Sequence, residues 1–227
     1  MKEGISILIA AYRAEKYIEE CINSITTTTP HEILIGVDGC RKTYNVIKKK
    51  QSDRIKIYNK EINTGAYDTW NMLVTKASFN HILIFAADDI MNEGFLDNAF
   101  DELGGFDYMN IRCHTFEHGN DSVYEWVVDG VILIRTDVIK EVNGYQRWQC
   151  SGDTELKYRL KHYGYFGKAS NSIGFRYRRH EDSLTMRMGK ESDIRLQYKS
   201  MIDEMILHKS FTDPIDGISS HASKGAD

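Results

Sequence analysis

The sequence lacks the long apolar runs, the paired cysteines and the excess of positive charge that mark several large classes of protein. No apolar stretch among its 227 residues approaches the roughly 20 residues that a transmembrane helix needs. Four cysteines are present, but no two form a C-x-x-C pair, and no histidine and cysteine spacing is typical of a zinc site. The formal net charge is −4, so no overall basic field would attract nucleic acid or anionic lipid.

These absences favour a soluble, cytoplasmic protein with reduced thiols, although an even number of cysteines would permit two disulfides. A strand-like run follows "MKEG" directly, without the basic and apolar regions of a secretory leader. The apolar content of 41% is enough for a sizeable core, and 227 residues suit one large domain or two small ones.

Short apolar runs alternate with segments of helical periodicity in the first half of the chain. Strands are predicted at 5–11, 32–39, 54–58 and 81–86, with helices between them at 14–25, 42–50 and 66–77. Strands that are apolar on both faces and separated by helices indicate a parallel sheet, which binds ligands beyond the carboxyl ends of its strands. Asp38 ends the second strand, and Asp88 and Asp89 end the fourth. We therefore expect these carboxylates to face a crevice at one edge of an α/β sheet.

The second half is less regular. Strands are predicted at 108–116, 130–136 and 172–180, with helices at 137–142, 152–165 and 190–210. The segment from residue 212 onward has little apolar content and is expected to be loose.

Six short motifs occur in order along the chain. They are "AAY" at 10–12, "VDG" at 37–39, "NTG" at 63–65, "DD" at 88–89, "GDTEL" from 152 with "RL" and "GY" after it, and "RRH" at 178–180. This ordered set, over roughly residues 4 to 185, resembles a family 2 glycosyltransferase of the GT-A fold. The resemblance implies a Rossmann-like, mainly parallel sheet flanked by helices, with a smaller mixed region on the acceptor side. It also implies a nucleotide-sugar donor, usually a UDP-sugar, a divalent ion such as Mn²⁺ or Mg²⁺, and inversion at the sugar carbon.

The resemblance further implies one glycosyltransferase domain over residues 1–211, with a nucleotide-binding half at about 1–105, a catalytic, acceptor-side half at about 106–211, and a loose tail at 212–227. We expect a non-processive enzyme of polysaccharide biosynthesis, acting on a glycan, glycolipid or glycoprotein, with no nucleic acid partner and no transmembrane segment. Processive relatives carry a "QxxRW" motif. The "QRW" at 146–148 precedes the candidate base with the wrong spacing, so we interpret it as coincidental.

Asp88 and Asp89 are the candidate metal ligands. Mg²⁺ and Mn²⁺ prefer hard oxygen ligands, and an ion shared between these carboxylates and a nucleotide diphosphate would offset the negative charge. His180 can complete the metal shell, and Arg178 and Arg179 can hold the diphosphate. The alternatives are a helix cap for one aspartate and a basic surface patch for the other three residues.

Besides Arg178 and Arg179, the candidates for nucleotide binding are Ala10, Ala11, Tyr12, Asp38, Asn63, Gly65 and Asp88. The family places backbone and an aromatic ring against the nucleobase at the position of Tyr12, and Asp38 could accept the uracil imide N–H. The turn at 63–65 suits a glycine, which adopts unusual backbone angles at low cost. The alternatives are ordinary partial burial for Tyr12, a turn role for Asp38, and a plain helix N-terminus for the segment that begins at residue 63.

Asp153 is the candidate general base, because it opens a predicted helix in the "DTEL" context that the family shares. Glu155 cannot share its helix face and is the second choice, while an N-terminal helix charge is the alternative role for Asp153. The family often has further acids where this chain has Ala86 and Gly152.

Trp126, Asp129 and Gly130 are candidates to line the donor-sugar or acceptor pocket, although a tryptophan in the core is an equal alternative. Two rival functions are open. A sugar nucleotidyltransferase would need a glycine-rich phosphate loop, and "AAYRAEKY" contains no glycine. A nucleotide-sugar or glycan-binding protein of the same fold with impaired catalysis is supported by the missing acids at 86 and 152.

Overall fold

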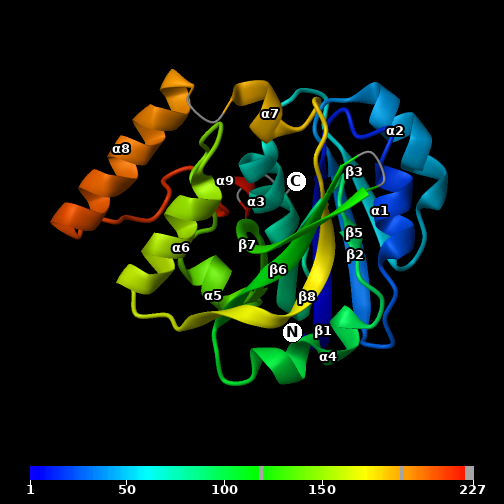
Figure 1. Cartoon of the computed structure of the whole chain (residues 1–227), viewed down its shortest axis with the longest axis horizontal. Helices are drawn as coiled ribbons and strands as arrows, with labels where there is room; N and C mark the ends of the chain where they lie inside the picture. Colours follow the sequence, from blue (N-terminus) through cyan, green and yellow to red (C-terminus); the bar gives the residue numbers. More distant parts are fainter. Residues whose placement is uncertain (118–119, 190–191, 223–227) are drawn as a thin grey trace.

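An eight-stranded sheet runs through the part of the chain described by the computed structural model, which is residues 1–117, 120–189 and 192–222 (Figure 1). Its strand order is β3-β2-β1-β4-β7-β6-β8-β5. The parallel half contains β1 (Lys2–Ala11), β2 (His31–Val37), β3 (Ile55–Asn59) and β4 (Phe79–Ala86). The predicted order of strand and helix in this half is confirmed.

The other half of the sheet is mixed, as predicted. It contains β5 (Ile90–Met91), β6 (Tyr108–Glu117), β7 (Asn120–Arg135) and β8 (Gly167–Arg178). Strand β7 runs antiparallel to β4 and β6, whereas β8 runs parallel to β6 and antiparallel to β5. Both β7 and β8 begin earlier than predicted, because pairing with β6 extends them over polar segments that have no strand pattern of their own.

Helices cover both faces of the sheet, which explains why its strands are apolar throughout (Figure 1). One face packs against α1 (Ile18–Ser24), α2 (Arg41–Ile47), which continues into the 3-10 turn Lys48–Lys50, and α4 (Phe95–Leu103). The other face packs against α3 (Ala66–Val74), α5 (Thr136–Glu141) and α6 (Gly152–His162). Alternate residues of β1 divide between the two layers, with Ile7 and Ile9 in the first and Leu8 in the second.

The C-terminal part adds α7 (Leu184–Met188), α8 (Asp193–His208) and α9 (Ser219–Ala222). Helix α8 lies at the outer edge of the molecule beyond α6 (Figure 1), and Ile202 is its one buried residue. The expectation of a loose tail is wrong for residues 212–222. Ile218 is 8% exposed, and Asn143 donates a hydrogen bond to the carbonyl of Pro214 at 2.5 Å. These contacts come from distant parts of the chain, so local composition did not reveal them.

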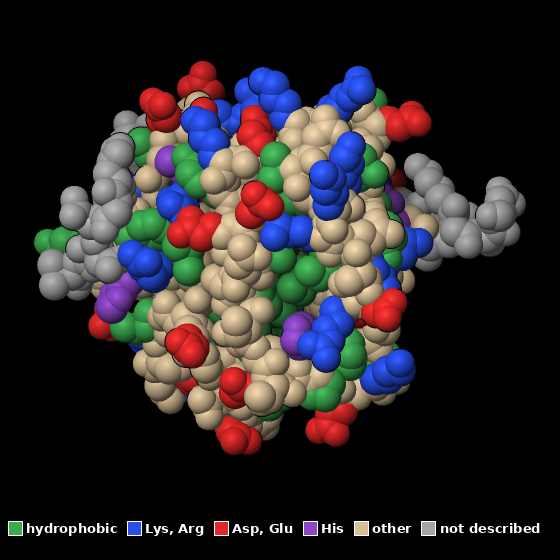
Figure 2. Space-filling view, turned by 90° about the vertical axis from the view of Figure 1, so that its right-hand side faces the viewer, with side chains coloured by type: hydrophobic (Ala, Val, Ile, Leu, Met, Phe, Trp, Pro, Cys, Tyr) green, Lys and Arg blue, Asp and Glu red, His purple; other side chains and the backbone are tan. Residues whose placement is uncertain are grey.

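The surface carries charges of both signs. Lysine and arginine side chains are interspersed with aspartate and glutamate on the face in Figure 2. All four cysteines are buried and unpaired. No helix in the described residues is long and apolar enough to cross a membrane.

Candidate active site

A cavity of about 670 Å³ opens at the carboxyl ends of β1, β2 and β4. This is the edge at which the sequence predicts a crevice. Its wall is built from five separate parts of the chain, which contribute residues 10–14, 63–66, 86–88, 147–149 and 182–184, together with single residues such as Tyr17, Asp38, Trp70, His180 and Arg187. The fold thus gathers backbone edges, aromatic rings and charged groups from both halves around one space.

Seven of the nine residues that we predict to bind the nucleotide line this cavity. They are Ala10, Ala11, Tyr12, Asp38, Asn63, Gly65 and Asp88. The Tyr12 ring lies near two cationic groups, with the guanidinium carbon of Arg13 at 5.2 Å and that of Arg187 at 5.9 Å from its centroid. A flat aromatic face beside positive charge suits a stacked base with a phosphate group attached.

Asp38 holds the turn after β3 against the end of β2. Its side-chain oxygens accept the backbone N–H groups of Thr64 at 2.9 Å and Gly65 at 2.8 Å, and Lys60 Nζ lies 2.9 Å from Oδ1. The residue is 2% exposed. Gly39 follows with a φ of 66°, and a Cβ there would lie 2.4 Å from the backbone nitrogen of Asn63. The turn role of Asp38 is therefore established, and contact with a nucleobase remains a prediction.

Asp88 and Asp89 lie in different environments. Asp88 faces the cavity, and its Oδ2 is 2.8 Å from Nε2 of His180, which lines the same cavity. Asp89 is 1% exposed and is not among the described residues that line the cavity. Its Oδ1 accepts the backbone N–H of Arg178 at 2.8 Å, and its Oδ2 has no hydrogen-bond partner in the described part of the chain. Burial and the neighbouring Asp88 raise the pKa of Asp89 well above its usual value.

One carboxylate and one imidazole thus meet at the cavity wall. These donors suit Mg²⁺ or Mn²⁺, provided that oxygen atoms of a bound ligand or water complete the shell. Within the residues that the structure describes, no group of three His, Cys, Asp or Glu side chains is placed to hold a metal ion. The expectation that Asp38, Asp88 and Asp89 all face the crevice is wrong for Asp89, and the assignment of Asp88, Asp89 and His180 as metal ligands stays a prediction.

The predicted diphosphate contacts Arg178 and Arg179 are not among the described residues that line the cavity. Arg178 donates from Nε to the backbone carbonyl of Asp88 at 2.7 Å and from Nη2 to Glu20 at 2.5 Å, so it holds the Asp88 turn in place. Arg179 is exposed. The arginines that line the cavity are Arg13, Arg147 and Arg187.

Arg147 and Trp148 of the "QRW" segment line the cavity, and the interpretation of its match to "QxxRW" as coincidental stays a prediction. Sequence reasoning missed all three cavity arginines. Arg13 follows directly after the "AAY" motif, which was a usable signal. Arg147 and Arg187 reach the cavity through tertiary packing, and no local pattern identifies them.

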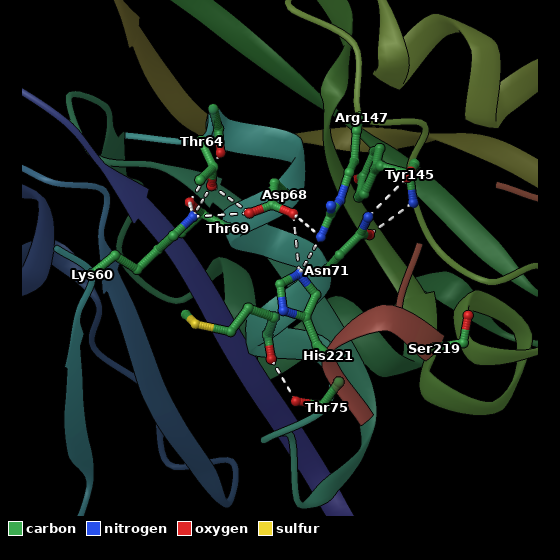
Figure 3. A network of polar contacts seen from close by, with 12 residues as sticks. Lys60, Thr64, Asp68, Thr69, Asn71, Thr75, Tyr145, Arg147, Ser219 and His221 are labelled. Carbon is green, nitrogen blue, oxygen red and sulfur yellow. Dashed lines mark hydrogen bonds and ion pairs between the residues drawn. The ribbon is translucent and has the colours of Figure 1, made fainter. Parts of the chain in front are cut away.

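A buried carboxylate, Asp68 in α3, joins the two sides of the cavity (Figure 3). Lys60 Nζ donates to its Oδ2 at 3.0 Å, while Arg147 at 2.5 Å and His221 at 3.1 Å contact its Oδ1. Although burial acts the other way, hydrogen bonds from His221, Thr64 and Lys60 hold the pKa of Asp68 well below its usual value. Because Lys60 also contacts Asp38, one network links the predicted base site, the arginine wall and the C-terminal segment.

The candidate base Asp153 lies near the start of α6, one layer outside the cavity wall. Its Oδ1 accepts a hydrogen bond from Tyr67 Oη at 2.8 Å, and the Tyr67 ring packs edge-on against Trp70, which lines the cavity. Burial raises the pKa of Asp153, the Tyr67 hydrogen bond opposes that rise, and the carboxylate of Asp129 adds to it. A carboxylate with a raised pKa close to a cavity is suited to exchange a proton with a ligand.

Glu155 is wrong as the second choice for the base. It is completely buried and forms an ion pair with Arg159, whose Nε lies 2.8 Å from Oε1. The role of this pair is structural, because neither group reaches the cavity.

Two of the three pocket candidates lie beside Asp153. Asp129 pairs with Lys157 at 2.7 Å, and a Cβ at Gly130 would lie 3.2 Å from Asp153 Oδ2. Trp126 is 42% exposed, so the alternative of a core tryptophan is wrong, and it is not among the described residues that line the cavity. A contact between Trp126 and a sugar remains a prediction.

Comparison with known proteins identifies the family. The model of glycosyl transferase family 2 matches residues 6–184, which include the whole cavity edge of the sheet. The chain belongs to glycosyl transferase family 2. A curated member, glycosyltransferase GlyG of Streptococcus pneumoniae serotype 4, is 24% identical over 153 residues, covering 64% of this chain and 51% of the relative. The chain thus spans about half the length of this family 2 relative.

Solved structures of S. aureus TarS share the fold. The structure of TarS residues 1–349 in complex with UDP-GlcNAc has a TM-score of 0.71 and 18% sequence identity, and covers 93% of this chain and 74% of that one. The complex of the same fragment with UDP has a TM-score of 0.67 and 17% identity, with 93% and 72% of the two chains covered. The predicted fold class, a GT-A type α/β fold, is therefore confirmed.

Proposed function

We propose that this family 2 chain transfers a sugar from a UDP-linked donor to a hydroxyl of a glycan or other acceptor, non-processively and with inversion at the sugar carbon. The observation that carries the proposal is the arrangement of Tyr12, Asp38 and Asp88 around one cavity at the carboxyl ends of the parallel strands. The UDP and UDP-GlcNAc complexes of TarS support a donor of this class.

The residues of the cavity divide among the parts of such a donor. Tyr12 would stack on the base, and Asp38 retains acceptor capacity for the uracil N–H beside its backbone contacts. Arg13, Arg147 and Arg187 supply positive charge for the diphosphate. Asp88 and His180 would hold a divalent ion, which, when bound, offsets the negative charge of the leaving diphosphate.

Asp153 would act as the base in a single displacement. The acceptor O–H bond breaks and its proton moves to Asp153, while the acceptor oxygen bonds to the sugar carbon from the face opposite the diphosphate. The bond between that carbon and the phosphate oxygen breaks, and UDP leaves with the electron pair. A positioned base typically contributes about 10²–10⁴ in rate.

The test is the release of free UDP from a panel of UDP-sugars with Mn²⁺, measured for the wild type and for Asp153→Asn. We expect the variant to lose about 10²–10⁴ in kcat and to keep its affinity for UDP, because Asp153 is not among the described residues that line the cavity. Asp137→Asn is the matched control, since Asp137 also lies in the first turn of a helix but is exposed. Unchanged turnover by folded Asp153→Asn enzyme would remove Asp153 as the base.

A second candidate, a nucleotide-sugar-binding protein without turnover, is favoured by one observation. Ala86 lines the cavity where the family often has an acid. Tight binding of UDP with no UDP release from any sugar donor would establish this alternative.

Calorimetry with CDP in place of UDP tests the contact between Asp38 and the nucleobase. The cytosine ring nitrogen carries no proton, so a carboxylate that faces it should weaken binding about ten- to hundred-fold.

A further inference from the structure

Tyr67 occupies the space beside the first residue of α6. A Cβ at Gly152 would lie 3.1 Å from Cε2 and Cζ of the Tyr67 ring and 3.2 Å from its Cδ1. These separations are shorter than ordinary van der Waals contacts, so a side chain at 152 would require the Tyr67 ring to move by a few tenths of an ångström. The glycine therefore allows the tyrosine ring to reach the start of α6.

The ring places its hydroxyl on Asp153. Tyr67 is 6% exposed and packs against Trp70 and Tyr145, with centroid distances of 5.7 and 5.4 Å, so its orientation is fixed by two aromatic neighbours. Its Oη donates to Asp153 Oδ1 at 2.8 Å. Burial and the neighbouring Asp153 raise the pKa of Tyr67 well above its usual value, so the hydroxyl remains a donor at neutral pH.

The other oxygen of Asp153 lies against Gly130 of β7, where the lack of a side chain leaves space. Asp129, on the same strand, is the charged group that faces Asp153 from this side, and it is paired with Lys157 of α6. Tyr145 lies on the remaining side, and its hydroxyl has no hydrogen-bond partner among the described residues. Thus one carboxylate oxygen is held by Tyr67 and the other faces Gly130, while the backbone N–H groups of Asp153 and Thr154 also hydrogen-bond to the carboxylate.

We propose that Tyr67 is the positioning residue for the base, fixing Asp153 Oδ1 so that Oδ2 is presented to the acceptor hydroxyl. The assignment rests on the proposed function, because it gives the contact a role only if Asp153 accepts the proton. Tyr67 does not itself touch the reacting atoms. Its hydroxyl also stabilises the ionised carboxylate, which keeps the base active at a pH that burial alone would not permit.

The decisive variant is Tyr67→Phe, which keeps the ring and removes the hydroxyl. The carboxyl carbon of Asp153 is followed by NMR in protein labelled with ¹³C-aspartate, and its signal is identified by its loss in Asp153→Asn. We expect Tyr67→Phe to raise the titration midpoint of Asp153 by about one pH unit or more. Tyr145→Phe is the matched control, since it removes a buried hydroxyl without a partner in the same aromatic cluster. An unchanged midpoint in Tyr67→Phe would overturn the proposal.

A second variant tests the contact from the other side. Gly152→Ala should push the Tyr67 ring away from Asp153. It should therefore raise the titration midpoint of Asp153 in the wild-type background and have no effect in the Tyr67→Phe background. Additive effects of the two changes would contradict a shared contact.

Turnover separates this inference from the proposed function. UDP-GlcNAc serves as the probe donor. In Tyr67→Phe the acid limb of the plot of kcat against pH should shift to higher pH by the same amount as the NMR midpoint, at unchanged KM. On that limb a shift of one pH unit lowers turnover about tenfold. If the midpoint moves but Asp153→Asn retains turnover, the proposed base is wrong and the contact stands. If Asp153→Asn is inactive and Tyr67→Phe leaves both profiles unchanged, the proposed function stands and the positioning role fails.

Discussion

At the scale of single residues, the adjacent carboxylates Asp88 and Asp89 lie in different surroundings. Asp88 faces the cavity and contacts His180, whereas Asp89 is buried and holds the backbone of Arg178. The same residue type thus serves as a candidate ligand at one position and as a structural acceptor at the next. The sequence shows the doublet, and the structure distinguishes its members.

The first prediction concerns the metal. Asp88→Asn should remove the strengthening of UDP binding by Mn²⁺. Loss of a residue that only supports a metal ligand typically lowers metal affinity about 10- to 100-fold, so loss of a direct ligand should lower it by more than about tenfold. Isothermal calorimetry with and without Mn²⁺ measures it. Asp89→Asn is the matched neighbour and should retain the Mn²⁺ effect. Loss of that effect in a folded Asp89→Asn variant would place Asp89 in the metal shell instead.

At the scale of the element, helix α6 combines the candidate base at its start with a buried ion pair in its interior. Glu155 and Arg159 are both completely buried, and Arg159 also donates to the backbone carbonyls of Val142 and Gly144. The helix is therefore tied to the segment after α5, and this contact fixes where Asp153 lies. The buried ion pair that stabilises the helix and the proposed base thus lie at different positions of α6.

Glu155→Gln should lower the free energy of unfolding by about 3 kcal/mol, because it leaves the charge of Arg159 buried without its main partner. Denaturant unfolding followed by circular dichroism measures the change. The matched control is Glu204→Gln in α8, which breaks a contact of the same i,i+4 spacing with His208 on the exposed surface and should have little effect. Equal effects of the two changes would contradict a structural role specific to α6.

At the scale of the whole molecule, the C-terminal segment closes over the second helical layer. Ile218 packs in the same cluster as Leu73 and Val142, and His221 reaches Asp68 beneath the cavity wall (Figure 3). Asp213 lies 3.6 Å from Arg159. Residues 212–222 are thus part of the folded unit.

Ile218→Ala should lower the free energy of unfolding by about 2 kcal/mol, since it removes a buried side chain from this cluster. Ile215→Ala is the control at three residues' distance, because Ile215 is 93% exposed and its truncation should change little. Thermal or denaturant unfolding of both variants gives the comparison. A loose segment would make the two variants equally stable.

The sequence by itself determined the α/β class, the parallel half of the sheet and the edge at which the cavity opens. These features follow from local rules: continuous apolar strands between helices require a sheet covered on both faces, and polar residues at strand ends gather at one edge. The motifs likewise singled out Tyr12, Asp38, Gly65 and Asp88, which line one cavity, and their contacts with a nucleotide stay predictions.

Only the tertiary structure decided the direction in which each charged group faces. Asp89, Arg178 and Glu155 carry plausible local signals, yet each is bound to a partner distant from the cavity or buried behind it. Arg147 lines the cavity and Ile218 packs in the core, although no local sequence pattern identifies either residue. The physical reason is that hydrophobic periodicity specifies which face of an element is buried, whereas the partner of a charge depends on elements brought together from far along the chain.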